Sequence, residues 1–358
     1  MRSIRSSVPV WLVACVAAAC ADAGPPPAAP GAPLDPPRPN ADLEMMMGDA
    51  KAPSAPPDAE AEKKAEAARK LAEDFAKLEK EQATEKTRWN ETLRKQVADL
   101  SNKDFKSFKA ALQDVVKSPH RTPGASERDK DRHPVETLTF FGLKQDMSVL
   151  ELDAGAGWYT ELLAPVLRKK GKLTVAGPSP EGPMTERSTL YGKRLRGFLD
   201  KAPELGDKVD YITIDPTAGF VLPADRKGAF DAVLAFRALH NWQRRNVLDK
   251  NLTAVFEALK PGGVFAVEAH RAKPGADPKA SAEKGYLPEA FVIERVQAAG
   301  FKLDGKSEIN KNAKDTTDYP EGVWTLPPTL RLGDKDKDKY VSIGESDRMT
   351  LKFVKPKK

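Results

Sequence analysis

The stretch MSVLELDAGAGWYTELLAP, residues 147 to 165, decides the fold class of this chain of 358 residues. Its apolar run up to Asp153 predicts a strand, and the residues from Trp158 onward predict a helix. The turn between them carries Gly155 and Gly157. Glycines let a backbone come close to a ligand at the carboxyl end of a strand, because a Cβ would block that approach. The order therefore predicts an α/β domain with a ligand site at this turn, and a plain tight turn is the alternative.

Further strands follow at regular spacing. They are predicted at residues 171 to 177, 209 to 215, 229 to 236, 259 to 268, directly after Phe301, and at 349 to 354. Apolar strands that alternate with amphipathic helices are typical of a parallel sheet with helices on both faces. We therefore expect a Rossmann-like α/β fold with a seven-stranded, mostly parallel sheet.

This series of elements resembles the class I S-adenosylmethionine-dependent methyltransferases. ELDAGAG, residues 151 to 157, is similar to their first motif, and LKPGGVFAVE, residues 259 to 268, is similar to their fifth strand and the turn before it. Between residues 118 and 356, stretches such as GWYTELLAP, FRALHNW and IGESDRMTLKFVKP more closely resemble a family of predicted bacterial methyltransferases. Many members of that family carry signal peptides, and it has no defined substrate.

The resemblance implies S-adenosyl-L-methionine as the cofactor and an unidentified small molecule as the methyl acceptor. It places four residues around the methionine part of the cofactor: Glu151, Asp153, Gly155 and Gly157. It also implies that Asp215 accepts a hydrogen bond from the adenine amine, and that Phe236 and the turn after it form the floor of the pocket.

Two positions depart from the family pattern. Asp153 stands where the first glycine of the motif is usual, and Gly177 stands where an acid normally holds both ribose hydroxyls. No Asp or Glu occurs from residue 163 to residue 179. The departures favour an alternative function, an envelope protein that binds a ligand or partner and has lost the cofactor. A structural lipoprotein is a third hypothesis, since fold does not fix function.

Histidines are the candidate catalytic residues. The chain has four, at positions 120, 133, 240 and 270, and His240 and His270 follow the fourth and fifth predicted strands. A histidine there is a candidate general base, because its ordinary pKa lies near neutrality. A structural hydrogen bond is the alternative for each. The four show no metal-ligand spacing, so no metal site is expected.

Two further segments have side chains that suit a binding site, and each has two interpretations. The turn from His133 to Glu136, with Arg121 and Arg132, is interpreted either as an anion-facing opening or as a structural cap. Residues 308 to 334 combine aromatic and polar side chains between the last two strands, which suits either a lid over a small-molecule pocket or an ordered surface loop.

The first 57 residues predict export. Arg2 and Arg5 precede an apolar run over residues 8 to 19, which is typical of a signal peptide and too short to span a bilayer. Residues 1 to 20 are therefore interpreted as a signal or lipoprotein segment, and the Pro/Ala-rich residues 21 to 57 as a disordered linker. Cys15 fits the lipidation pattern LVAC better, whereas Cys20 leaves the more usual apolar length. We expect a bacterial lipoprotein of the periplasm or outer membrane, held to the membrane only by its lipid.

Residues 58 to 117 form a charged helical segment before the methyltransferase-like domain of residues 118 to 358. Its apolar stripe is interrupted at Gln82 and Glu85, so we expect a solvated helix that lies against the domain, with a dimerisation or partner helix as the alternative. With 58 Lys and Arg against 52 Asp and Glu, the net charge of +6 is small, and nucleic acid is not an expected partner. The oligomeric state stays open.

Replacing both Cys15 and Cys20 by Ser is expected to abolish lipidation and to release the protein from membrane fractions, because the acyl chain is its main apolar anchor. Fractionation followed by immunoblotting measures this, with mass spectrometry of the N-terminus. Unchanged fractionation together with an uncleaved N-terminus would contradict the prediction.

Overall fold

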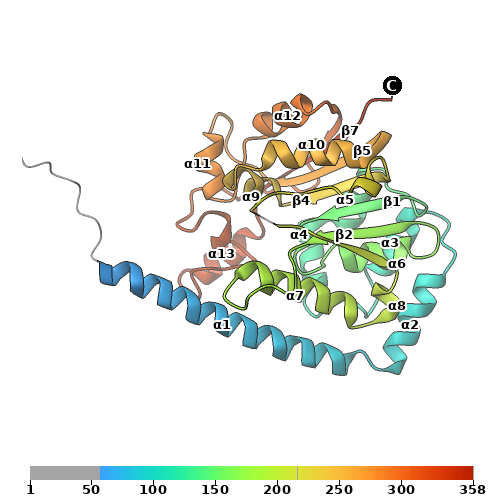
Figure 1. Cartoon of the computed structure of the whole chain (residues 1–358), viewed down its shortest axis with the longest axis horizontal. Helices are drawn as coiled ribbons and strands as arrows, with labels where there is room; N and C mark the ends of the chain where they lie inside the picture. Colours follow the sequence, from blue (N-terminus) through green and yellow to red (C-terminus); the bar gives the residue numbers. More distant parts are fainter. Residues whose placement is uncertain (1–56, 216, 358) are drawn as a thin grey trace, which may run out of the picture. The chain divides into compact units, whose positions relative to one another are not determined.

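A computed structural model describes residues 57 to 215 and 217 to 357. Its sheet has seven strands in the order β3-β2-β1-β4-β5-β7-β6 (Figure 1). The strands are β1 (Ser148–Leu152), β2 (Lys172–Gly177), β3 (Val209–Thr213), β4 (Phe230–Phe236), β5 (Leu259–His270), β6 (Lys302–Ser307) and β7 (Arg348–Val354). The first five are parallel, and β7 is antiparallel between β5 and β6. The predicted seven-stranded, mostly parallel sheet is confirmed.

Helices cover both faces of this sheet (Figure 1). On one face lie α6 (Thr160–Leu167), α7 (Arg187–Asp200) and α8 (Pro203–Gly206), and on the other lie α9 (Leu239–Arg244), α10 (Leu248–Ala258) and α12 (Glu289–Ala298). Successive side chains of a strand point to opposite faces. Val149 of β1 accordingly joins the first core, while Leu150 and Leu152 join the second. The buried residues of the central strand are therefore apolar toward both faces apart from Glu151.

The remaining elements connect these layers. They are α4 (Asp129–Arg132), α5 (Pro134–Phe140), α11 (Pro278–Glu283), α13 (Lys337–Ile343), and three short 3-10 turns at Ser126–Arg128, Ala224–Arg226 and Gly322–Thr325. One strand differs from its predicted bounds. β3 ends at Thr213, not at Asp215, because the Asp215 carboxylate accepts backbone N–H groups of Thr217 and Ala218 and turns the chain.

The expected helical segment folds as three helices, α1 (Pro57–Arg88), α2 (Glu91–Asn102) and α3 (Phe108–Val115). The break after α1 follows from Asn90, whose side chain accepts the backbone N–H of Leu93 and caps α2. Leu78 of α1 packs on Leu190 of α7, while Val97 and Leu112 are fully buried in the core that contains β1. The segment thus shares the core of the domain, and packing is continuous across residues 117 and 118.

The two polar residues that interrupt the apolar stripe of α1 contact α7. Gln82 donates a hydrogen bond to the carbonyl of Lys193 at 3.1 Å, beside Gly197, whose missing Cβ leaves room for it. Glu85 accepts from Lys201 at 3.0 Å and from Arg88. Figure 1 shows α1 running along α7. The interruption therefore reflects polar contacts with the domain.

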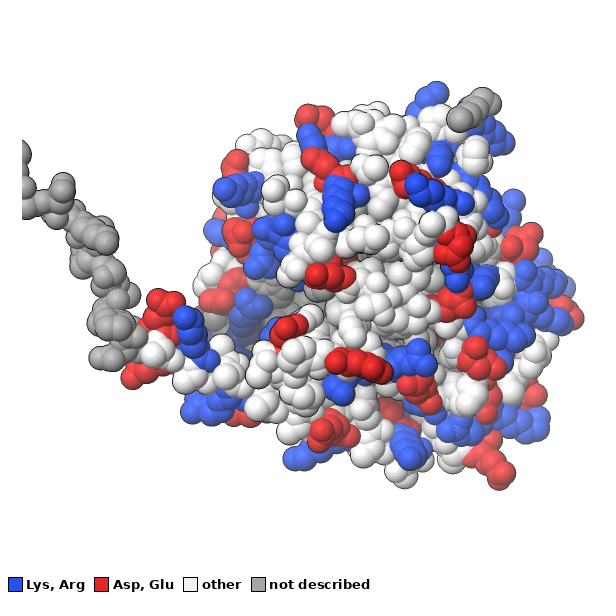
Figure 2. Space-filling model, in the orientation of Figure 1, with Lys and Arg blue, Asp and Glu red and all other residues white. Residues whose placement is uncertain are grey.

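The distribution of surface charge and the N-terminal residues concern the sequence predictions on partners and export. Figure 2 shows basic and acidic side chains interspersed over most of the face that it draws. Among the described residues, no helix combines the length and apolar character that crossing a bilayer requires. The predicted signal segment of residues 1 to 20 lies outside the described residues, as does nearly all of the predicted linker.

Because α2 and α3 complete the core, a chain that begins at residue 118 is expected to lose cooperative unfolding, whereas the unit from Pro56 to Lys358 keeps it. Within that unit, Leu112→Ala should lower the free energy of unfolding by about 2–5 kcal/mol, because it leaves a cavity. Lys109→Ala on the exposed face of α3 is the matched control, with a change of about 0.5 kcal/mol or less. Chemical denaturation followed by circular dichroism measures both. A cooperative transition in the shorter chain would contradict the prediction.

Candidate functional site at the carboxyl edge of the sheet

The glycine turn between β1 and α6 lies where the central strand ends. Gly155 and Gly157 have φ of +62° and +83°, a backbone conformation that other residues adopt only with strain. A Cβ on Gly157 would lie 2.8 Å from the Phe198 ring, whereas one on Gly155 would meet nothing closer than 3.9 Å. Gly157 is thus required by packing. Gly155 is exposed and presents bare backbone at the strand end.

Asp153 ties this turn to α9. Its φ is +51°, which explains why a glycine is usual at this position of the motif. Its carboxylate accepts a hydrogen bond from the indole N–H of Trp242 at 2.7 Å. The side chain is therefore already occupied by a partner within the protein.

Glu151 is a buried acid at the end of β1, with 4% of its surface exposed. It accepts the hydroxyl hydrogen of Thr160 at 2.7 Å. Burial raises the pKa of Glu151 to about 7, against the lowering effects of the Thr160 hydrogen bond and the Arg237 charge. The carboxyl group can therefore take up or release a proton near neutral pH.

Asp215 is exposed beyond the end of β3. One of its oxygens accepts three hydrogen bonds, from the hydroxyl and N–H of Thr217 and the N–H of Ala218, and the other is left toward solvent. The cavity between Asp215, Leu152 and Trp242 measures about 10 Å³, which is roughly the space of one water molecule. The crevice between β1, β3 and α9 is therefore closed in this conformation.

Gly177, at the end of β2, is packed against α7 and β3. An added Cβ would lie 2.8 Å from Leu195 Cδ2 and 2.9 Å from the Tyr211 hydroxyl, which itself donates to the carbonyl of Pro178 at 2.6 Å. A side chain at position 177 would therefore enter the packing between α7 and β3. An acid at this position would therefore require the ends of the Leu195 and Tyr211 side chains to move.

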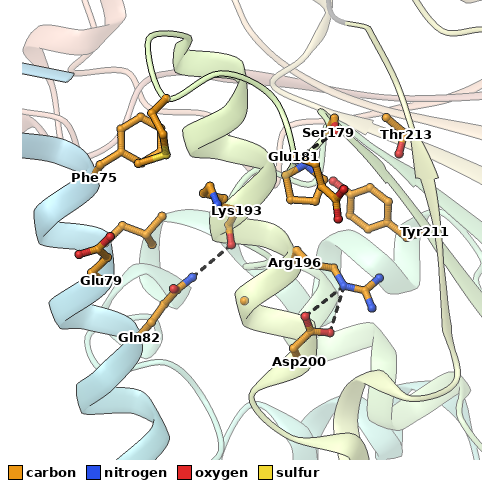
Figure 3. Close-up of a pocket in the computed structure, with 14 residues that line it drawn as sticks. Phe75, Glu79, Gln82, Ser179, Glu181, Lys193, Arg196, Asp200, Tyr211 and Thr213 are labelled. Atoms are coloured by element: carbon orange, nitrogen blue, oxygen red, sulfur yellow. Dashed lines mark hydrogen bonds and ion pairs between the residues drawn. The ribbon is translucent and has the colours of Figure 1, made fainter. Parts of the chain in front are cut away.

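A large groove opens beside this position, with a volume of about 1030 Å³. Figure 3 shows Phe75, Glu79 and Gln82 of α1 on one side and Ser179 and Glu181, from the loop after β2, on the other. Arg196 and Asp200 of α7 form an ion pair at 3.0 Å along its wall. Sequence reasoning did not place α1 at this groove, because it joins segments about a hundred residues apart.

Phe236 ends β4 and packs inward. Its ring contacts those of Tyr159 and Phe141, with centroids 4.5 and 5.6 Å apart. The hydroxyl of Tyr159 donates to Glu268 at 2.7 Å, and burial with the charge of Glu268 raises the pKa of this tyrosine. Phe236 thus packs against Tyr159, which lies two residues after Gly157 of the glycine turn.

An ion-pair network fills the edge beyond β5 and β7. Glu268 of β5 lies 3.2 Å from the Nε of Arg348, and Arg348 also contacts Glu345 at 2.7 Å. Glu345 further accepts from Arg128 at 2.6 Å and from Arg132 at 3.0 Å. Burial makes these contacts strong and makes any unpaired charge among them costly.

The two candidate catalytic histidines come together. The rings of His240 and His270 lie 5.4 Å apart, and His270 Nδ1 lies 2.5 Å from the Ser346 hydroxyl. Burial, together with the charges of Arg244, Arg237 and Arg245, lowers the pKa of His240 to about 3. Burial, His240 and nearby arginines also lower the pKa of His270. Both rings are therefore neutral near pH 7 and are weak bases.

The other two histidines lie elsewhere. His120 bonds the carbonyl of Glu161 and the hydroxyl of Ser118, both at 2.8 Å, and His133 lies 3.4 Å from the side-chain oxygen of Asn310. Within the described ranges, no group of three or more potential ligand side chains is arranged to hold a metal ion.

The loop of residues 308 to 334 reaches this site. Trp324 lies with its ring 6.0 Å from that of His240, and the guanidinium groups of Arg244 and Arg331 stack on it. Arg121, one of the two arginines considered for an anion-facing opening, pairs instead with Glu161 and Asp129. Arg132 lies in the buried network.

Sequence reasoning missed most of that network. Glu268 closes the motif-like stretch LKPGGVFAVE, and Arg237 directly follows the fourth strand, so their positions were visible signals. Arg348 and Glu345 lie about eighty residues beyond Glu268 in the family-like stretch IGESDRMTLKFVKP, but nothing local paired them with Glu268. Only β5–β7 pairing, which sets His270 opposite Arg348, brings them to this edge.

The sheet order, the antiparallel β7 and the glycine turn after the central β1 together define the Rossmann-like class I methyltransferase fold. No protein-family model and no curated protein matches the chain. Similar solved structures include an S-adenosylmethionine-dependent methyltransferase from Aquifex aeolicus, at 16% identity over 70% of this chain and 100% of that one, with a TM-score of 0.41.

Two further structures are similar to a comparable degree. A sarcosine dimethylglycine methyltransferase described as putative, from Galdieria sulphuraria, has 16% identity over 68% of this chain and 91% of its own, with a TM-score of 0.43. The cyclase SpnF has 17% identity over 64% and 81%, with a TM-score of 0.44. Similarities this low say nothing about ligand or activity, so these must be argued from the site.

Gly177→Asp is expected to lower the free energy of unfolding by about 1–3 kcal/mol from overpacking alone, because its Cβ meets Leu195 and Tyr211. The buried charge adds to this loss. Gly177→Ala separates the two effects, and Ser179→Asp in the more open loop is the control that should keep the native melting temperature. A melting temperature for Gly177→Asp equal to that of the natural chain would show that the side chain finds another direction.

Proposed function

We propose that this chain is an S-adenosylmethionine-dependent methyltransferase that acts on a small-molecule acceptor. The observation that carries the proposal is the turn of Gly155 and Gly157, with bare backbone at the end of the central strand. In open α/β sheets, ligands bind at the carboxyl ends of the strands. The buried acid Glu151 and the exposed Asp215 stand on either side of this point.

The residues fit the cofactor in part. The backbone around Gly155 would hold its methionine part, and the second oxygen of Asp215 would accept from its adenine amine. At the ribose, Ser179 and Glu181 would replace the usual acid, because they lie in the loop directly after β2 and line the large groove. The closed crevice beside Trp242 requires this side chain or the loop after β3 to shift when the cofactor binds.

When bound, the cofactor supplies a methyl group on a positively charged sulfur. The chain itself mainly positions the acceptor, which is the chief protein contribution to such a transfer. His240 and His270 are neutral near pH 7, and Nδ1 of His240 has no hydrogen-bond partner among the described residues. The low pKa makes His240 a weak base, so its proposed role is to position the acceptor through a hydrogen bond.

The second candidate is an envelope protein that binds a ligand or partner on this fold without the cofactor. The closed crevice and the close packing around Gly177 favour it. Export also bears on the choice, because S-adenosylmethionine is made in the cytosol. We propose export and a lipid anchor from residues 1 to 20, whose charged start, apolar run and cysteines support it.

Titration calorimetry of the unit from Pro56 to Lys358 separates the two candidates. The methyltransferase proposal expects both S-adenosylmethionine and S-adenosylhomocysteine to bind. Asp215→Asn should weaken binding by roughly tenfold to a hundredfold. The amide oxygen would stay with Thr217 and Ala218, which leaves toward the adenine amine an N–H₂ group that cannot accept a hydrogen bond. Asp225→Asn, at another exposed acid, is the control without effect.

The absence of heat with both compounds, in a chain that melts cooperatively, would reject the methyltransferase and leave the cofactor-free binding protein. Unchanged binding by Asp215→Asn would reject only the adenine contact.

A further inference from the structure

Four guanidinium groups gather at the carboxyl edge of β4 and β5 around only two carboxylates. They belong to Arg128, Arg132, Arg237 and Arg348, and the two carboxylates to Glu268 and Glu345. Glu345 serves three of the arginines, and Glu268 is shared between Arg348 and the hydroxyl of Tyr159. Positive charge therefore exceeds negative charge within this network.

The acidic residues near this network do not compensate for its excess positive charge. Arg121, Glu161 and Asp129 pair with one another. Glu151 lies near enough to Arg237 to feel its charge, but burial keeps the pKa of Glu151 at about 7, so it supplies only part of a negative charge at neutral pH. Arg237 forms no ion pair with any residue in the described ranges.

Four buried nitrogens at this edge lack hydrogen-bond partners among the described residues, and one of them, Nε of Arg348, lies in an ion pair with Glu268 Oε1, which also has no hydrogen bond. The other three have neither kind of partner among those residues. They are Nη1 of Arg132, Nη1 of Arg237 and Nδ1 of His240. Arg132 is 2% exposed and His240 is 5% exposed. A buried polar group without a partner is costly, most of all when it is charged, and native proteins rarely keep one without a use. An acceptor oxygen from outside the chain would satisfy the two arginine nitrogens, and also His240 in the tautomer that carries its proton on Nδ1.

Arg237 is the centre of this arrangement. It is the first residue after β4, and its backbone N–H donates to the carbonyl of Glu268 on the neighbouring strand at 2.6 Å. Its φ of +58° is costly for a residue with a side chain, and such strain is retained where the residue serves a site. Its charge acts on Glu151, His240 and His270, which come from three other parts of this edge.

We infer that Arg237, together with His240, binds an anionic oxygen group, a carboxylate or a phosphate, of the molecule that this site accepts. A guanidinium group offers two parallel N–H donors that match either group. The group would neutralise the surplus charge and give Arg237 Nη1 its missing partner. The inference rests on the proposed function only in assigning the anion to the methyl acceptor, because the anion site itself needs no cofactor.

The test measures the melting temperature of the unit from Pro56 to Lys358 without S-adenosylmethionine. Inorganic phosphate and acetate are titrated in separate arms, with chloride keeping the ionic strength constant. The melting temperature of the natural chain should rise to a plateau as at least one of the two anions is added. The anion that gives the plateau at lower concentration is the one the site prefers. Arg237→Gln should bind that anion roughly tenfold to a hundredfold more weakly.

Two further variants complete the design. Arg226→Gln is the matched control, because Arg226 is also a half-buried arginine but pairs with Asp210 at the opposite end of the sheet. It should respond like the natural chain. Arg237→Lys keeps the positive charge but loses the two parallel N–H donors. Its affinity for the anion should therefore lie between those of the natural chain and Arg237→Gln. This variant decides the question if the Gln variant does not fold.

Absence of anion-specific stabilisation in the natural chain would overturn the inference. So would equal responses of the natural chain and the Arg237 variants. If the anion binds as inferred while S-adenosylmethionine does not, the anion site stands and the methyltransferase proposal alone fails.

Discussion

The contact between Glu268 and Arg348 holds the functional edge of this protein together. Both side chains are almost fully buried, and a buried charge is stable only while its partner stays in place. Glu268 belongs to β5 and also accepts from Tyr159 beside the glycine turn, while Arg348 begins β7 and leads through Glu345 to Arg128 and Arg132. One ion pair thus fixes the turn, the last strand and the segment before β1 relative to one another.

The helical segment before the domain adds a second constraint. α1 packs on α7, and α7 in turn packs against the end of β2, where a Cβ at Gly177 would lie 2.8 Å from Leu195. The same helix pair lines the groove of about 1030 Å³, next to Ser179 and Glu181. The packing at the end of β2 and the lining of this groove are therefore built by the same two helices.

Much of the fold could be predicted from the sequence, because strand and helix periods are local. The seven strands lie within a few residues of their predicted positions, and the glycine turn lies at the end of the central one. The errors arise where a side chain competes with the regular structure. Asp215 turns the chain two residues early, and Asn90 starts a new helix inside a stretch of strong helix formers. His240 and His270 were found as candidates because they follow predicted strands, but their contact was not.

By itself, the sequence determined the order of elements, the sheet class and the composition of the glycine turn, since each depends on neighbouring residues. Tertiary structure alone decided which charges are buried together. Arg237 becomes a candidate anion ligand only because β4 ends beside Glu268, and the network exists only because the antiparallel β7 sets Arg348 opposite His270. Asp153 likewise has its partner only because α9 brings Trp242 across the turn. Burial and pairing of charges depend on residues far apart in the chain, so no local pattern records them.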